Sequence, residues 1–514
     1  MSTRTETLQR AVQPFFLQPS ERVKVSVSAT AHPSVTALGI AAPTASEPFK
    51  SLGLGRERLG TAGFHGAPGE TFIVTRTDGP LFVAAGVGAP DQLDSTRIRD
   101  AAAAFARAAA SHVHLGLSLD GLEKGPVPVE AAAQAVVEGI LLGRYEFAGF
   151  GRERKERAVE EINLVTSAAE EAAARSGAER GRAYAEATIL ARNLANTPHS
   201  HLTATRLGEV AVKLGQQNGF DVELFDKAAL QKLDCGGLLG VNAGSVEPPC
   251  MIKMIYRPAK ESPGSVALVG KGIMYDSGGI SLKANDNVHA RMKNDMSGAA
   301  AVLAAFVHLK ELGCPVAVTG YLMCTDNMPS GSAQALGDVI TTPGGRTVEV
   351  TNTDAEGRLV MCDALALAAA EGHDAIIDVA TLTGSVMRAL GTDMAGVFSN
   401  DPALLEQVRR AARATDESVW QLPLHREYRD VLDSDVASMK NAGPTGGTQP
   451  DGIVAALYLA EFVGNVPWAH VDICGTAWYD KDRLWQRAGC SGFGARLLLE
   501  LVTHFEPIKR PSRH

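Results

Sequence analysis

Apolar strand-like runs alternate with helical patterns along the second half of this chain, and this alternation constrains the fold more than any other feature. The runs and the helical patterns follow one another as Ser265–Val269, Ser297–Leu312, Val316–Met323, Arg358–Glu371 and Ala375–Val379. Continuous apolar runs are typical of strands that are buried on both faces, so the order predicts a mostly parallel sheet flanked by helices. In such a sheet, functional groups gather at the carboxyl ends of the strands.

The alternation predicts two unequal α/β domains. Short β-like runs, Gly/Pro turns and one Ala-rich helix indicate a smaller N-terminal α/β domain in residues 1–165. A long helical pattern with Ala on one face follows, and we expect residues 166–192 to form a linker helix that ends before Pro198. Residues 193–514 are then expected to form the larger, catalytic α/β domain with the central sheet.

The composition favours a globular protein and argues against polyanionic partners. The chain has 514 residues, of which 45% are hydrophobic and 21% are charged, as in ordinary soluble proteins. Its 58 acidic residues exceed its 49 basic ones, which argues against nucleic acid and anionic membranes as principal partners. We expect the basic tail Lys509–Arg513 to be solvated rather than to act as a binding arm.

The cysteines and the N-terminus indicate a cytoplasmic protein. Seven cysteines are present, none precedes Cys235, and no pair has the C-x-x-C spacing. This pattern predicts free thiols in a reducing compartment rather than a disulfide framework or a zinc knuckle. Met1–Phe16 has no apolar signal region, and Val25–Ser46 is too polar and too rich in proline to span a membrane.

Charged residues gather directly after the first apolar run of the predicted central sheet. Lys271 and Asp276 follow Ser265–Val269, and Lys283 and Asp295 come later in the same segment. Taken singly, Asp295 could be an ordinary N-cap and the others solvated loop charges. A phosphate-binding P-loop is excluded, because Lys271 is followed by glycine and no glycine precedes it at the required offset.

A second group of charges lies in Asn352–Arg358. In an extended chain, Asp354, Glu356 and Arg358 would share one face, because side chains two positions apart point the same way. The alternative is a helix that begins near Gly357 with acidic residues in its first turn. This alternative accounts for Glu356 but not for the crowding of all three charges.

The candidate residues named in the two segments include three Asp, one Glu and two Lys. This set suits two divalent cations that share carboxylates better than it suits one cation. Lys271 could bind a metal only as a neutral amine. Such a ligand set suits zinc, manganese, cobalt or magnesium. No H-E-x-x-H motif is present, and the absence of G-x-S-x-G argues against a serine hydrolase.

Three segments resemble the cytosolic leucine aminopeptidase family, whose members are two-metal exopeptidases. The segments are Lys271-Gly272-x-x-x-Asp276-x-Gly278-Gly279, Met292-Lys293-x-Asp295 and Asn352-Thr353-Asp354-Ala355-Glu356-Gly357-Arg358-Leu359. The last of these is highly specific. The resemblance extends over about Asn193–Leu501, and the first 165 residues are similar only in being a plausible α/β domain.

The resemblance implies roles for individual residues. The implied metal ligands are Lys271, Asp276, Asp295, Asp354 and Glu356. Of these, Asp276 and Glu356 would bridge the two metals together with a water or hydroxide. Lys283 would polarise the scissile carbonyl, and Arg358 would hold a bicarbonate ion as general base. The residues expected to line the substrate pocket are Met292, Asn352, Thr381, Leu382 and Gly384.

We therefore expect a metal-dependent aminopeptidase that removes leucine and other apolar residues from the N-termini of peptides. The resemblance further implies a homohexamer with two ions per subunit, manganese or zinc being favoured over cobalt or magnesium. One alternative is a two-metal phosphoesterase, because carboxylate clusters also serve phosphoryl transfer. Another is a non-catalytic hexameric scaffold or nucleic-acid binder, which the intact ligand set and the acidic balance disfavour.

Overall fold

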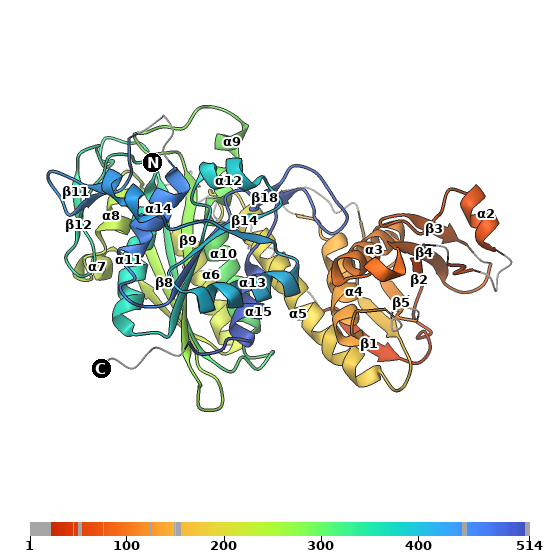
Figure 1. Cartoon of the computed structure of the whole chain (residues 1–514). Helices are drawn as coiled ribbons and strands as arrows, with labels where there is room; N and C mark the ends of the chain where they lie inside the picture. Colours follow the sequence, from red (N-terminus) through yellow and green to blue (C-terminus); the bar gives the residue numbers. More distant parts are fainter. Residues whose placement is uncertain are drawn as a thin grey trace. The chain divides into compact units, whose positions relative to one another are not determined.

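The computed structural model describes residues 22–44, 46–49, 54–75, 77–120, 122, 125–148, 150, 156–444 and 450–508. These residues form two compact units (Figure 1). The N-terminal unit contains the described residues from Arg22 to Ile189 together with the late segment Tyr479–Gly489. The C-terminal unit contains residues 190–478 and those from 490 onward. The segments Met1–Phe16 and Lys509–Arg513, for which the sequence supports expectations, lie outside the described residues.

The N-terminal unit is built on a six-stranded sheet in the order β1-β6-β5-β2-β4-β3. All neighbouring strands are parallel except β3 and β4. The strands are β1 (Lys24–Ser28), β2 (Ala37–Pro43), β3 (Thr71–Val74), β4 (Leu81–Gly88), β5 (His114–Ser118) and β6 (Glu161–Val165). The helical segments are α2 (Arg56–Thr61), η3 (Pro90–Gln92), α3 (Ser95–Ala108), α4 (Val129–Gly143) and most of α5 (Glu171–Asn196).

Small residues let the helices of the N-terminal unit approach one another closely. The buried face of α3 is an alanine run, and α3 packs on α4 and on β4. A side chain at Gly139 of α4 would meet the carbonyl oxygen of Arg99 at 2.3 Å. A glycine is therefore needed where α4 crosses α3.

The C-terminal unit is built on an eight-stranded sheet in the order β15-β14-β17-β13-β9-β10-β8-β7. Its strands are β7 (Asp221–Phe225), β8 (Cys250–Tyr256), β9 (Ser265–Asp276), β10 (Ala317–Asn327), β13 (Ala375–Ala380), β14 (Ala395–Ser399), β15 (Val419–Gln421) and β17 (Trp468–Asp472). Smaller sheets pair β11 (Val339–Thr341), β12 (Thr347–Glu349) and β16 (Met439–Lys440), and β18 (Trp478–Tyr479) with β19 (Gly489–Cys490).

Helices cover both faces of this sheet (Figure 1). On one face, α10 packs on β9 and β13 and against α6 and α15, which also contacts α13. On the other face, α11 packs on β9 and against α8 and α14. The helical segments are α6 (Ala204–Asn218), α7 (Lys227–Lys232), α8 (Gly236–Asn242), α9 (Asn287–Ala290), η4 (Met292–Met296), α10 (Ser297–His308), α11 (Glu356–Glu371), α12 (Gly384–Leu390), α13 (Pro402–Thr415), η5 (Arg426–Leu432), α14 (Asp451–Ala460) and α15 (Ala495–Thr503).

Four neighbouring strands, β17, β13, β9 and β10, run parallel to one another in the centre of the sheet. Their carboxyl ends therefore meet at one edge, where Asp472, Ala380, Asp276 and Asn327 are the last residues of the strands. The predicted architecture of a smaller N-terminal and a larger C-terminal α/β domain, the latter with a mostly parallel sheet between helices, is confirmed. Among the described residues, no helix is both long and apolar enough to cross a membrane.

Candidate metal centre

Strand β9 places two of the predicted ligands, Lys271 and Asp276, each only 2% exposed. The sequence predicts a loop after Val269, but the strand continues through Asp276, because it remains paired with β10. Between Ile273 and Asp276, β9 advances three residues while β10 advances two, from Thr325 to Asn327. Because of this bulge, Lys271 and Asp276 lie on the same face of the strand, although an odd number of positions separates them.

Lys271 binds two carboxylates and one carbonyl group. Its Nζ lies 2.8 Å from Asp295 Oδ2 and 2.8 Å from Glu356 Oε1, and it donates a hydrogen bond of 2.8 Å to Thr381 O. The ammonium group fits because residue 357 is glycine, where an added Cβ would lie 2.8 Å from Nζ. Asp295 lies within η4 rather than in the N-cap position that was the simpler alternative, since Met296 precedes α10.

Lys283 reaches the same cluster from the loop after β9. Its Nζ lies 2.6 Å from Asp276 Oδ2 and 2.5 Å from Asp354 Oδ1. The loop turns back at Gly278, whose φ of +90° is a conformation that glycine adopts without strain. Asn327, at the end of β10, donates to Asp276 Oδ1 at 2.8 Å and so fixes the orientation of this carboxylate.

The charged group at Asp354–Arg358 is not extended. Helix α11 begins at Glu356, so Glu356 and Arg358 lie in its first turn and the prediction of a shared face on an extended chain is wrong. An acidic residue is favoured in a first helical turn because of the helix dipole. Asp354 lies just before the helix, and one ligand atom each from Asp276, Asp354 and Glu356 lies within 4.8 Å of the others.

The charges of this cluster do not balance, because four carboxylates face only the two ammonium groups of Lys271 and Lys283. Burial, reinforced by the charge of Glu356, raises the pKa of Asp276 to about 6. Burial alone would lower the pKa of Lys271, but the surrounding carboxylates raise it instead. Glu356 Oε2 is buried and makes no hydrogen bond with the described residues. An unpaired carboxylate oxygen and a surplus of negative charge fit divalent cations at this position.

The predicted substrate-lining residues come from η4, from the segment before α11 and from the segment after β13. Thr381 follows β13 and donates from Oγ1 to Asp295 Oδ1 at 2.7 Å. Met292 is the first residue of η4, and Asn352 accepts a hydrogen bond from the backbone N–H of Asp354 at 2.9 Å. Leu382 and Gly384 lie between the end of β13 and the first turn of α12.

One further residue, Asp472, holds the Leu382–Thr383 segment in place and was not predicted as a site residue. Its carboxylate accepts hydrogen bonds from the backbone N–H groups of Leu382, Thr383 and Cys474 and from the Thr383 hydroxyl. Asp472 is fully buried, and this burial raises its pKa. Its position at the end of β17, the neighbour of β13, is the signal that could have identified it.

The guanidinium group of Arg358 is only 3% exposed. Nη2 donates to Asp451 Oδ1 at 2.9 Å, and Nη1 donates to Asn441 O at 3.0 Å. Asn441 also binds the backbone of Asn352 through both its side-chain oxygen and its side-chain nitrogen. Sequence reasoning predicted Arg358 as a site residue but not Asp451 or Asn441.

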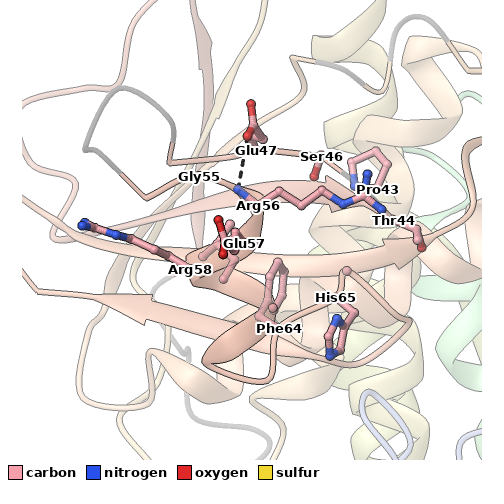
Figure 2. A pocket seen from close by; sticks show the side chains of 13 residues that line it. Pro43, Thr44, Ser46, Glu47, Gly55, Arg56, Glu57, Arg58, Phe64 and His65 are labelled. Atoms are coloured by element: carbon pink, nitrogen blue, oxygen red, sulfur yellow. Dashed lines mark hydrogen bonds between the residues drawn. The ribbon is translucent and has the colours of Figure 1, made fainter.

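The N-terminal unit contains a different kind of concave site, a cavity of about 820 Å³ (Figure 2). In this cavity, the side chain of Arg56 extends toward Pro43, and Glu47 Oε1 accepts a hydrogen bond of 3.2 Å from the backbone N–H of Arg56. Its wall carries the charged residues Glu47, Arg56, Glu57 and Arg58, and it contains no group of three metal-binding side chains among the described residues. The candidate metal centre therefore lies in the C-terminal unit.

Two family models match the chain. The model described as "Cytosol aminopeptidase family, catalytic domain" matches residues 189–499. The model described as "Cytosol aminopeptidase family, N-terminal domain" matches residues 51–154. The first match contains all five predicted metal ligands.

Individual proteins are also similar over most of their length. A "Probable cytosol aminopeptidase" of Chlorobium luteolum is 41% identical over 88% of this chain and 95% of its own. Another of Chlorobaculum tepidum is 45% identical over 73% of this chain and 75% of its own. Among solved structures, the "Bottromycin maturation enzyme BotP in complex with Mn" is 36% identical with a TM-score of 0.83, covering 91% of this chain and 99% of that one.

Proposed function

The chain belongs to the cytosol aminopeptidase family and is a metal-dependent aminopeptidase, and on this premise we propose that it removes N-terminal leucine and other apolar residues from peptides with two divalent metal ions. The observation that carries the proposal is the convergence of Asp276, Asp354 and Glu356 within 4.8 Å, beside the Lys271–Asp295 pair. Manganese or zinc suits this set of oxygen ligands and one nitrogen.

The residues divide into two groups by what they can do. Two bound cations would be held by Lys271, Asp276, Asp295, Asp354 and Glu356, and when bound they would activate a shared water and hold the free α-amine of a peptide. Lys283 is the cation that can stabilise negative charge on the scissile carbonyl oxygen, because it is already held at the cluster. The proposed requirement for a free α-amine restricts cleavage to N-terminal residues.

We propose that Arg358 binds the anion that acts as the general base. It presents a buried positive charge in the first turn of α11, two positions from Glu356. A guanidinium group binds planar anions strongly. The family resemblance gives this anion as bicarbonate, which would accept the proton of the attacking water.

The experiment compares three substrates with the protein loaded with manganese or with zinc. We expect release of leucine from leucine amide, none from N-acetyl-leucine amide, and no hydrolysis of p-nitrophenyl phosphate. Hydrolysis of the blocked amide would contradict the role of the α-amine. Turnover of the phosphoester without turnover of leucine amide would instead support the two-metal phosphoesterase.

We further propose that the protein is a homohexamer in the cytoplasm, as the family resemblance implies, with peptides rather than nucleic acid or membranes as partners. Light scattering of the full chain should give six times the 54.0 kDa mass of one subunit. A monomer at micromolar concentration would contradict this assembly.

A further inference from the structure

The side chain of Thr353 joins two of the segments that carry the charges of the candidate metal centre. Its Oγ1 donates a hydrogen bond of 2.8 Å to Gly278 O and accepts one of 2.8 Å from the backbone N–H of Ser281. The backbone N–H of Thr353 also donates to Ser281 Oγ at 3.3 Å. Gly278 and Ser281 belong to the loop after β9, whereas Thr353 directly precedes Asp354. Thr353, which is only 4% exposed, therefore holds this loop at two of its residues.

The loop after β9 is fixed by hydrogen bonds rather than by apolar packing. At its base, Ser277 Oγ donates to Asn327 O at 2.6 Å, and the backbone N–H of Lys283 donates to Ser277 O at 2.9 Å. The large apolar side chains of the loop, Ile280 and Leu282, are 48% and 61% exposed. Burial of these side chains therefore contributes little to the shape of the loop, and its hydrogen bonds contribute most.

The loop can lie this close to Thr353 because residue 279 is glycine. An added Cβ at Gly279 would lie 3.1 Å from Thr353 Oγ1 and 2.7 Å from Asn327 Oδ1. The side-chain nitrogen of Asn327 donates to Thr353 O at 2.9 Å and to Asp276 Oδ1 at 2.8 Å. Thr353 is thus connected to the loop, to the end of β9 and to the end of β10.

We propose that Thr353 is a positioning residue for Lys283, because its hydroxyl group fixes the loop from which the Lys283 ammonium group acts. The inference rests on the proposed aminopeptidase function, in which Lys283 stabilises negative charge on the scissile carbonyl oxygen. The ion pairs of Lys283 Nζ with Asp276 and Asp354 hold only the end of a flexible side chain. The hydrogen bonds of Thr353 hold the backbone of the loop instead. A displacement of about 1 Å at a charge-stabilising group is enough to slow catalysis strongly.

The test compares two variants of Thr353 in the manganese-loaded full chain, with leucine amide as the substrate. Thr353→Val replaces the hydroxyl group by a methyl group, and Thr353→Ser keeps the hydroxyl group. We expect Thr353→Val to lower kcat about 10-fold and to change KM by less than about twofold, because the loop acts on the transition state. Thr353→Ser should keep most of the natural kcat. A natural kcat in Thr353→Val, or an equal loss in both variants, would overturn the inference.

A double variant tests whether Thr353 acts through Lys283. In the Lys283→Ala background, Thr353→Val should cause no further loss of kcat, because the group that the loop positions is already absent. A further loss of about 10-fold in this background would show that the two residues act independently. Such a result would overturn the positioning role.

Thr342→Val is the matched control. Thr342 is fully buried and, like Thr353, donates from its hydroxyl group to a carbonyl oxygen of a turn, here Arg346 O at 3.0 Å between β11 and β12. We expect this variant to keep the natural kcat and KM, even where it lowers the melting temperature. A loss of kcat equal to that of Thr353→Val would show that the loss of any buried hydroxyl group has this effect, and would overturn the inference.

Hydrogen exchange provides a measurement that does not depend on turnover. The backbone N–H of Ser281 should exchange roughly 5-fold faster in Thr353→Val, because it loses its acceptor, and at the natural rate in Thr353→Ser and Thr342→Val. Mass spectrometry of the peptide that contains residues 278–283 measures this rate. Unchanged exchange in Thr353→Val would overturn the inference. If the natural protein does not hydrolyse leucine amide, the proposed function fails, whereas the exchange rate still decides whether Thr353 holds the loop.

Discussion

Each unit of this chain buries a cluster of charges, and the two clusters differ in their balance. In the N-terminal unit, Arg99 donates to Glu138 Oε2 at 2.8 Å, and Gln134 donates to Oε1 at 2.8 Å. The guanidinium carbon of Arg99 also lies 5.8 Å from the ring centroid of Trp485. Both oxygens of the Glu138 carboxylate are thus bonded to described residues, so this cluster requires no ligand.

In the C-terminal unit, four carboxylates share two ammonium groups, and Glu356 Oε2 is left without a hydrogen-bond partner among the described residues. Burying charges that are not compensated costs several kcal/mol per ion. The second cluster can therefore be explained by cations that supply the missing positive charge. The comparison teaches that the balance of charge, rather than the burial of charge, distinguishes a candidate site from a structural ion pair.

The largest expected effect comes from Glu356→Gln. Removing this proposed ligand should abolish binding of the proposed metal pair and cost several kcal/mol of transition-state stabilisation, which corresponds to about 1000-fold in rate. Added manganese should then no longer raise the melting temperature. Calorimetric melting with and without manganese, together with leucine amide hydrolysis, measures both effects.

Glu138→Gln in the N-terminal unit is the control for this variant. It should lower the free energy of unfolding by about 3 kcal/mol, because the buried guanidinium group of Arg99 loses the negative charge of Glu138. The rate and the stabilisation by manganese should remain at their natural values. If manganese failed to stabilise this variant, or still stabilised Glu356→Gln, the distinction between the two clusters would be lost.

A smaller effect is expected for Lys283→Ala. Loss of its ammonium group should lower kcat roughly 100-fold with little change in KM, because Lys283 is proposed to act mainly on the charge of the transition state. The metal content should remain unchanged. Lys253→Ala, which removes a lysine paired with Glu371 at 2.7 Å on the same sheet, should leave kcat unaltered. A rise in KM with kcat unchanged would instead show that Lys283 binds the substrate in the ground state.

A further prediction concerns a third arrangement, a buried carboxylate that pairs with no cation among the described residues. Asp363 of α11 accepts hydrogen bonds from the N–H groups of Gly237 and Leu238, and burial raises its pKa to about 8. Because the folded-state pKa lies above the unfolded value of 3.8, its contribution to stability is full below that value and is lost as the pH rises to about 8.

Asp363→Asn should remove this dependence, so that the difference in unfolding free energy between the variant and the natural protein changes steadily from about pH 4 to about pH 8. Urea unfolding at several pH values measures this difference. A difference that stays constant across the range would show that the hydrogen bonds to α8 fully offset the burial of the charge.

Much of the fold and the cluster could be predicted because the signals are local. Buried strands and helices have distinct periods, and the Asn352–Leu359 octet brings ligands together within one segment. The conformation of Asp354–Arg358 could not be predicted, because acidic residues suit both an extended strand and the first turn of a helix. The end of β9 was also mispredicted, since pairing with β10 depends on residues some 50 positions away.

The residues that were missed act across long stretches of sequence. Asp472 binds the backbone of Thr383 from 89 positions away, and Asp451 binds Arg358 from 93 positions away. Each of these acidic residues looks like an ordinary surface or cap residue in its own segment. Only the order of the strands and the packing of α14 on α11 reveal what they contact.

Because of the bulge in β9, the candidate site depends on the number of residues in this strand as well as on their types. Lys271 and Asp276 point toward the same cluster only because one extra residue lies between them relative to β10. Deleting Met274 would keep both side chains in the protein but would turn Asp276 toward the opposite face of the sheet. In this strand, variants that change residue type should be tolerated at Met274 more readily than variants that change residue number.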